Sequence, residues 1–175
     1  MNPLKKLASQ TVIYGLSSVV GRLLNYLLVP LYTRYFLPAE YGVVTELYAY
    51  VAFLVVLLTY GMETAFFRFS KKEETTNVYS TTLISLLISS VVFVGLIFLN
   101  SSAISQWLGY ANHPEYIQFF ALIIGMDAVA SISFAKLREQ DKAMQFAFIR
   151  IVNIMLNVGL NLYFIVYQEY GIAYI

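Results

Sequence analysis

The sequence predicts an all-α fold, a polytopic bundle of transmembrane helices, and two features of the chain support this prediction. Of the 175 residues, 59% are hydrophobic and only 12% are charged, whereas soluble globular domains carry about 25% charged residues. A surface so poor in charge is suited to lipid rather than water. The chain also contains five apolar stretches of about 20 residues, the length that a helix needs to cross a hydrocarbon core of about 30 Å.

The five predicted spans cover residues 11–32, 41–62, 81–99, 116–135 and 146–167. The first is too long for the apolar region of a signal peptide, which has about 7–15 residues, so we expect it to be retained as a helix. Polar or helix-breaking connectors separate the spans: Leu37–Glu40, Ser70–Glu74, Asn100–Ser102 with Asn112–Pro114, and Glu139–Lys142. Runs such as residues 51–58 are continuously apolar, which excludes the alternating strands of a membrane β-barrel.

The positions of lysine and arginine predict how the helices are oriented. Eight of the eleven basic residues fall on one side of the predicted membrane: Lys5, Lys6, Arg68, Lys71, Lys72, Lys136, Arg138 and Lys142. Only Arg34 lies in a connector on the other side, and Arg22 and Arg150 lie inside spans. Because positively charged loops stay in the cytoplasm, we expect a cytoplasmic N-terminus. The ending Tyr170–Ile175 has the composition of an opening sixth helix, so we expect residues 1–175 to be one domain of a longer protein.

Charged and amide side chains inside the spans are the candidate site residues. A charge at bilayer depth costs about 2.5–3.5 kcal/mol on insertion scales, so it is expected to face protein or a wet cavity. In the first span, Arg22 and Asn25 share one helical face. In the fifth, Arg150, Asn153, Asn157 and Asn161 fall at helical spacing and predict a polar stripe turned away from lipid.

Asp127 lies near the middle of the fourth span and has two interpretations. It could take part in ion coupling, or it could neutralise an arginine such as Arg22 or Arg150. Asn157 and Asn161 also have a structural alternative, because amide side chains often join membrane helices by hydrogen bonds. Two arginines against one acid favour an anionic ligand such as a phosphate or pyrophosphate.

Several function classes are excluded or disfavoured. The chain has no cysteine, and its net charge of +1 gives no basic field for nucleic acid. It contains no Walker A loop and no Gly-x-Ser-x-Gly or His-Glu-x-x-His motif. We therefore expect no enzyme, no cofactor and no metal site. The residues alone predict a transporter or channel.

Three segments resemble bacterial polysaccharide flippases of the multidrug/oligosaccharidyl-lipid/polysaccharide exporter superfamily. They are Gly21–Tyr26 with Pro30–Gly42, Gly61–Phe69, and Lys136–Glu139 followed by the asparagine-rich fifth span. The resemblance implies a protein of 12–14 helices in two lobes, with this chain forming most of the first. It implies a multi-pass protein of the bacterial cytoplasmic membrane that flips undecaprenyl-pyrophosphate-linked oligosaccharide for surface polysaccharides such as lipopolysaccharide O-antigen. Arg22 resembles a cavity arginine of the related lipid II flippases.

By this resemblance the expected partners are the lipid-linked oligosaccharide and membrane lipids, while no partner protein is indicated. Three alternatives remain open. A lipid II flippase differs only in its substrate. A multidrug antiporter of the same superfamily exports organic cations and favours carboxylates over arginines in its site. A membrane scaffold or assembly subunit is the alternative from another class.

Overall fold

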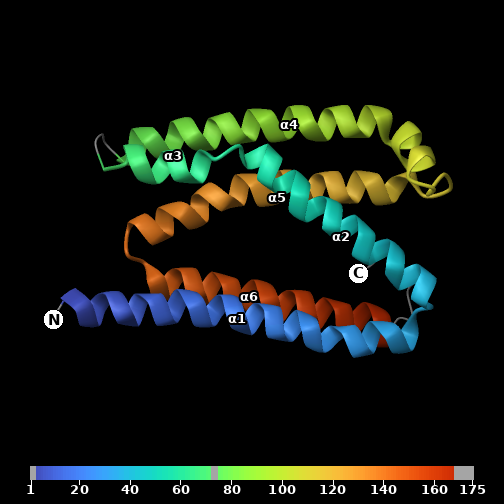
Figure 1. Cartoon of the computed structure of the whole chain (residues 1–175), viewed down its shortest axis with the longest axis horizontal. Helices are drawn as coiled ribbons and strands as arrows, with labels where there is room; N and C mark the ends of the chain where they lie inside the picture. Colours follow the sequence, from blue (N-terminus) through green and yellow to red (C-terminus); the bar gives the residue numbers. More distant parts are fainter. Residues whose placement is uncertain (1–2, 72–74, 168–175) are drawn as a thin grey trace. The chain divides into compact units, whose positions relative to one another are not determined.

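The computed structural model describes residues 3–71 and 75–167, which confirm the predicted all-α class (Figure 1). The described residues form helices and no strands. The elements are α1 (Pro3–Tyr35), α2 (Pro38–Thr59), α3 (Met62–Phe69), α4 (Thr75–Trp107), α5 (Pro114–Glu139), α6 (Ala143–Leu162) and the short π-helix η1 (Tyr163–Tyr167). Contacts divide the chain into unit 1, Met1–Thr45 with Leu137–Ile175, and unit 2, Glu46–Lys136. We describe each unit by itself.

Four segments of the described residues are long and apolar enough to cross a membrane. They are Pro38–Phe69, Asn77–Trp107, Pro114–Glu139 and Ala143–Ile165, and they contain nearly all of the second to fifth predicted spans. The first predicted span, residues 11–32, lies within α1, which has 33 residues. A helix of that length measures about 50 Å at 1.5 Å per residue, more than enough to cross the bilayer. That α1 crosses it stays a prediction.

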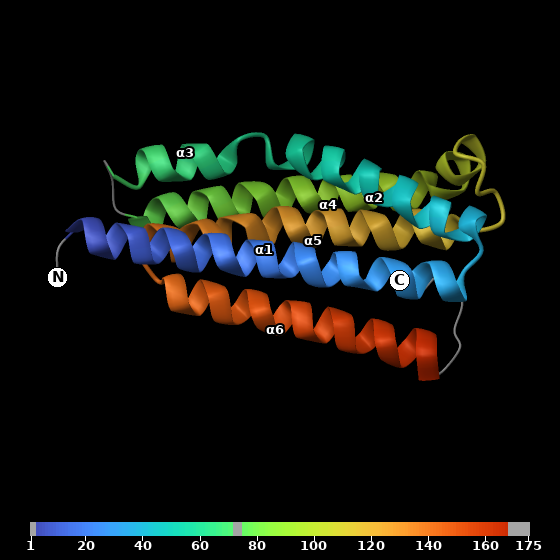
Figure 2. The same ribbon diagram turned by 60° about the horizontal axis from the view of Figure 1, so that its bottom comes forward.

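In unit 1, α1 and α6 run in the same direction and pack side by side (Figure 2). Near the start of α6, the rings of Tyr14 and Phe146 meet edge to face with their centroids 5.0 Å apart. Near the other end, Leu28, Tyr32 and Ile165 form a buried apolar cluster. A parallel pair is what the predicted topology requires of the first and fifth spans, since both would cross the membrane in the same sense.

In unit 2, α3 and α5 pack against α4. A cluster of five buried residues joins these three helices near the start of α4: Phe66, Val78, Leu86, Ile132 and Ala135. Phe66, Leu86, Ile132 and Ala135 are fully buried. Farther along, Gly125 of α5 lies so close to α4 that an added Cβ would come within 2.9 Å of Val94. This close approach fixes the spacing of α4 and α5.

The second predicted span is not one straight helix, because the chain breaks between α2 and α3. Tyr60 has φ of +33° and Gly61 has φ of +74°, and only glycine adopts such left-handed conformations without strain. Tyr60 also donates or accepts a hydrogen bond of 2.7 Å with Ser85 of α4. The predicted helix over residues 41–62 therefore ends at Thr59, and a new helix begins at Met62.

The predicted connector at Asn100–Ser102 is wrong, because α4 continues through it to Trp107. The polar side chains bond back to the helix itself: Asn100 Nδ2 donates to the carbonyl of Leu96 at 2.8 Å, and Ser101 Oγ donates to that of Phe98 at 3.0 Å. Such bonds satisfy a polar side chain within a helix and often bend it. The last turns of α4 do bend away from its axis (Figure 1).

Candidate functional site

The predicted site residues divide between the two units. Arg22 and Asn25 lie on the helical backbone of α1, and their side chains are outside the described part of the structure. Arg150, Asn153 and Asn157 lie on α6 and are all exposed. Their distances along α6 from Ala143 are about 10, 15 and 21 Å at 1.5 Å per residue. The three residues thus occupy successive depths of a helix that can span the bilayer.

Arg150 rests on an aromatic side chain of its own helix. Its Cζ lies 5.5 Å from the ring centroid of Phe146, within the range of a cation–π interaction. Phe146 is itself 5% exposed and contacts Tyr14 of α1. Aromatic support of this kind holds the guanidinium at the edge of the α1–α6 interface while leaving it accessible.

Asn161 lies on the same stripe but serves a different purpose. It is 4% exposed, and its Oδ1 accepts a hydrogen bond of 3.1 Å from the hydroxyl of Tyr32 in α1. Its Nδ2 donates to the carbonyl oxygen of Asn157 at 2.9 Å and lies 3.4 Å from the Asn157 Oδ1. The network joins α1 and α6, so the structural alternative holds for Asn161.

The stripe is divided between one buried residue and three exposed ones. At roughly 100° per residue, Asn161 lies on the same side of α6 as Ala143, and both are buried. Arg150, Asn153 and Asn157 lie within about 80° of Asn161 around the helix by the same count, yet all three are exposed. The helical period therefore gathers the four residues on one side of α6, and the accessible part of the stripe is formed by Arg150, Asn153 and Asn157. A guanidinium on a spanning helix is unfavourable against acyl chains, so this side requires water, protein or an anionic group beside it.

Asp127 lies halfway along α5, in unit 2. The buried face of α5 includes Ile124, Gly125 and Ala128, whereas Asp127 is exposed. Among the described residues it has no hydrogen-bond or ion-pair partner. Phe120, two turns earlier on the same side of α5, contacts Tyr48 of α2 with ring centroids 5.3 Å apart. The predicted pairing of Asp127 with an arginine stays a prediction.

A polar cluster that the sequence did not reveal lies at the end of unit 2 where α4 is connected to α5. The Glu46 carboxylate accepts hydrogen bonds from Tyr50 at 2.9 Å and from Tyr110 at 2.6 Å. Burial, followed by the bond to Glu46, raises the pKa of Tyr110 to about 12, so this hydroxyl stays protonated at physiological pH. Glu46 and Tyr110 are 64 residues apart in sequence, and no spacing signal could have paired them.

His113 lies in the same connection and is also partnered. Its Nδ1 is 2.8 Å from a carboxylate oxygen of Glu115, and its ring stacks on Tyr116 with a centroid distance of 4.8 Å. Among the described residues, no three His, Asp or Glu side chains are grouped as a metal site would require. These contacts order the connection between α4 and α5.

Comparison with known protein families matches the chain to a family described as polysaccharide biosynthesis protein. The match covers residues 31–173, most of the chain, and includes every described helix from α2 onward together with the end of α1. No curated protein and no solved structure matches the chain.

Proposed function

The chain belongs to the family of polysaccharide biosynthesis proteins, and we propose that it translocates lipid-linked oligosaccharide across the bacterial cytoplasmic membrane. The substrate would be an undecaprenyl-pyrophosphate-linked oligosaccharide destined for a surface polysaccharide. Four spans of sufficient length and hydropathy make the chain a multi-pass membrane protein, which agrees with a role in transport. We further propose that it moves its substrate by alternating access, as secondary transporters do, and catalyses no covalent step.

The accessible part of the α6 stripe carries this proposal. Arg150, Asn153 and Asn157 are exposed at successive depths of a spanning helix, and an arginine is the preferred partner of a phosphate group. In our proposal Arg150 contacts the pyrophosphate and the two amides contact the polar part of the substrate. Arg22 of α1 is proposed to face the same passage.

Substitution of Arg150 tests the proposal in a strain that lacks its own copy of the protein. We expect Arg150→Ala to reduce surface polysaccharide about tenfold or more, because a hydrogen bond to a charged group contributes about 1.5–3 kcal/mol and 1.4 kcal/mol is a factor of ten. Arg150→Lys keeps the charge but loses bidentate geometry, so an intermediate effect is expected. Immunoblotting of the polysaccharide measures the outcome.

Met155→Ala is the matched control, because Met155 is also exposed on α6 but lies on nearly the opposite side from Arg150. It should leave surface polysaccharide unchanged. Membrane levels of each variant must equal those of the wild type. Wild-type polysaccharide in an Arg150→Ala strain would contradict the proposed role of the stripe.

A second candidate function rests on Asp127. An exposed carboxylate halfway along a spanning helix favours binding of a cation, which suits either ion coupling or a multidrug cation antiporter. The same strains distinguish these functions. A flippase with Asp127 as its coupling residue loses surface polysaccharide on Asp127→Asn, whereas an antiporter loses resistance to organic cations and keeps its polysaccharide. A lipid II flippase would instead change peptidoglycan synthesis.

A further inference from the structure

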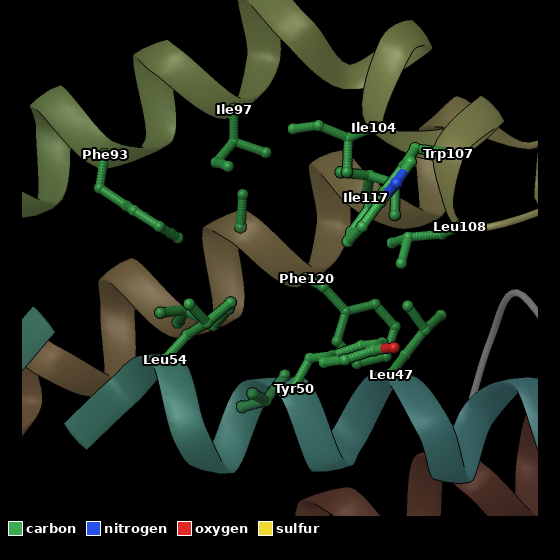
Figure 3. A pocket seen from close by; sticks show the side chains of 13 residues that line it. Leu47, Tyr50, Leu54, Phe93, Ile97, Ile104, Trp107, Leu108, Ile117 and Phe120 are labelled. Carbon is green, nitrogen blue, oxygen red and sulfur yellow. The ribbon is translucent and has the colours of Figure 1, made fainter. Parts of the chain in front are cut away.

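Unit 2 contains an apolar cavity of about 190 Å³ between α2, α4 and α5 (Figure 3). Leu47, Tyr50 and Leu54 of α2 point toward Phe93, Ile97 and Ile104 of α4 across the cavity, and Ile117 and Phe120 of α5 close another side. The lining residues of α4 and α5 lie in the halves of these helices nearest the α4–α5 connection, and those of α2 lie around its middle. All of them except Leu108 belong to segments long and apolar enough to cross a membrane.

The wall of the cavity is almost entirely apolar, and its polar atoms are the Tyr50 hydroxyl and the indole N–H of Trp107. Its thirteen lining residues are aliphatic or aromatic. The only hydroxyl among them belongs to Tyr50, and it donates to Glu46. Water in such a cavity would find few hydrogen-bond partners, and apolar cavities of about 150 Å³ stay dry and bind apolar molecules. The chemistry of the wall therefore selects a hydrocarbon.

The cavity borders a hollow on the surface of α4. This shallow hollow shares Ile97, Ile104 and Trp107 with the cavity, and Trp107 is 84% exposed. The hollow has one amide, Asn100, whose Nδ2 already donates to the Leu96 carbonyl. The side chains shared by the cavity and the hollow are aliphatic or aromatic, so a hydrocarbon chain meets almost only apolar groups where the two adjoin.

We propose that this cavity binds one acyl chain of a membrane phospholipid, which enters from the bilayer beside Trp107. Phospholipid acyl chains are the most abundant hydrocarbon around a spanning helix, and Trp107 belongs to the candidate span Asn77–Trp107. An acyl chain bound there fills the space between α2 and the α4–α5 pair. The proposal concerns unit 2 alone and does not depend on what the protein transports.

Filling the cavity with protein side chains tests the proposal. The full chain is reconstituted in vesicles of phosphatidylethanolamine and phosphatidylglycerol, extracted in mild detergent and examined by native mass spectrometry. Ala121, which is 2% exposed, and Leu54 both line the cavity. We expect Ala121→Phe and Leu54→Phe each to lose a phospholipid that the wild type retains.

Ala52→Phe is the matched control, because Ala52 is an exposed residue of α2 that does not line the cavity. It should retain the phospholipid. Two cavity-filling variants are used because one of them could fail to fold, which circular dichroism detects. The variant that folds then tests the proposal. Equal retention in the wild type and a folded filling variant would overturn the proposal, as would loss of the lipid in Ala52→Phe or retention of a polyprenyl lipid in place of a phospholipid.

Discussion

Asn157 and Asn161 lie one helical turn apart on α6, yet their surroundings differ. Asn161 is buried and bonded to Tyr32 of α1, while Asn157 is exposed and supplies its carbonyl oxygen to Asn161. In a bilayer, a buried amide without a partner is unfavourable because lipid offers no alternative hydrogen bond. The Tyr32–Asn161 bond should therefore stabilise the α1–α6 pair.

Tyr32→Phe tests the contribution of this bond to stability. The substitution removes one hydroxyl and leaves the Asn161 Oδ1 without its donor. We expect the free energy of unfolding to fall by about 0.5–2 kcal/mol. The lower value is typical of a hydrogen bond between membrane helices, and the upper value is typical of a buried polar group that loses its partner in a soluble protein. Thermal unfolding in detergent measures it. Tyr35→Phe is the control because Tyr35 is 47% exposed. An equal effect of the two substitutions would show that the bond contributes nothing specific.

At the scale of single residues, the sequence predicted where polar groups lie along the helices but not their partners. The spacing of Arg150, Asn153 and Asn157 predicted that they share one side of α6, and all three are exposed there; that this side lines a passage stays a prediction. The spacing could not show that Asn161 is buried against α1 while the other three are exposed, because that depends on how α6 packs on α1. The Glu46–Tyr110 hydrogen bond could not be predicted either, since it depends on how the connection between α4 and α5 packs against α2.

At the scale of elements, the helices themselves were largely predictable. Long apolar stretches must be helical in a bilayer, because every backbone group has to be satisfied within its own segment. One error came from local side-chain hydrogen bonding and the other from a local backbone conformation. Asn100 and Ser101 looked like a connector, yet their side chains bond to carbonyls of the preceding turn and keep α4 continuous. Tyr60 looked like part of a span, yet the left-handed Gly61 beside it ends α2.

The packing of α4 on α5 depends on the absence of a side chain at Gly125. A Cβ there would lie 2.9 Å from Val94 Cγ2 and 3.7 Å from Ser90 Cβ. We expect Gly125→Leu to destabilise the protein by about 1–3 kcal/mol, the usual effect of an overpacked interface. The thermal midpoint in detergent should fall accordingly.

Gly95→Leu is the matched control, because no atom lies within 4 Å of a Cβ added at Gly95 of α4. It should leave the midpoint close to that of the wild type. Combining Gly125→Ala with Val94→Ala restores the space and should recover more stability than Gly125→Ala alone. A Gly125→Leu variant as stable as the Gly95→Leu variant would mean that α4 and α5 do not pack as closely as the structure shows.

At the scale of the whole molecule, basic residues gather at one end of each unit. In unit 2, Arg68 lies in the last turn of α3, Lys71 follows that helix, and Lys136 lies near the end of α5. In unit 1, Arg138 lies next to the last residue of α5 and Lys142 precedes α6, while Arg34 lies at the far end of α1. The lysine and arginine residues that the sequence assigns to one side of the membrane thus lie at one end of the helices within each unit.

This asymmetry predicts which loops face the cytoplasm, and the absence of cysteine from the chain allows a direct test. We use two single-cysteine variants. Gln140→Cys replaces a residue between α5 and α6 at the basic end, and Ala111→Cys replaces a residue between α4 and α5. Both positions are exposed, and neither substitution removes a charge. Because positive loops are retained in the cytoplasm, a membrane-impermeant maleimide should label Ala111→Cys in intact cells. Gln140→Cys should react only after permeabilisation. The reverse pattern would invert the orientation, and the pyrophosphate would then meet the α6 stripe from the opposite side of the membrane.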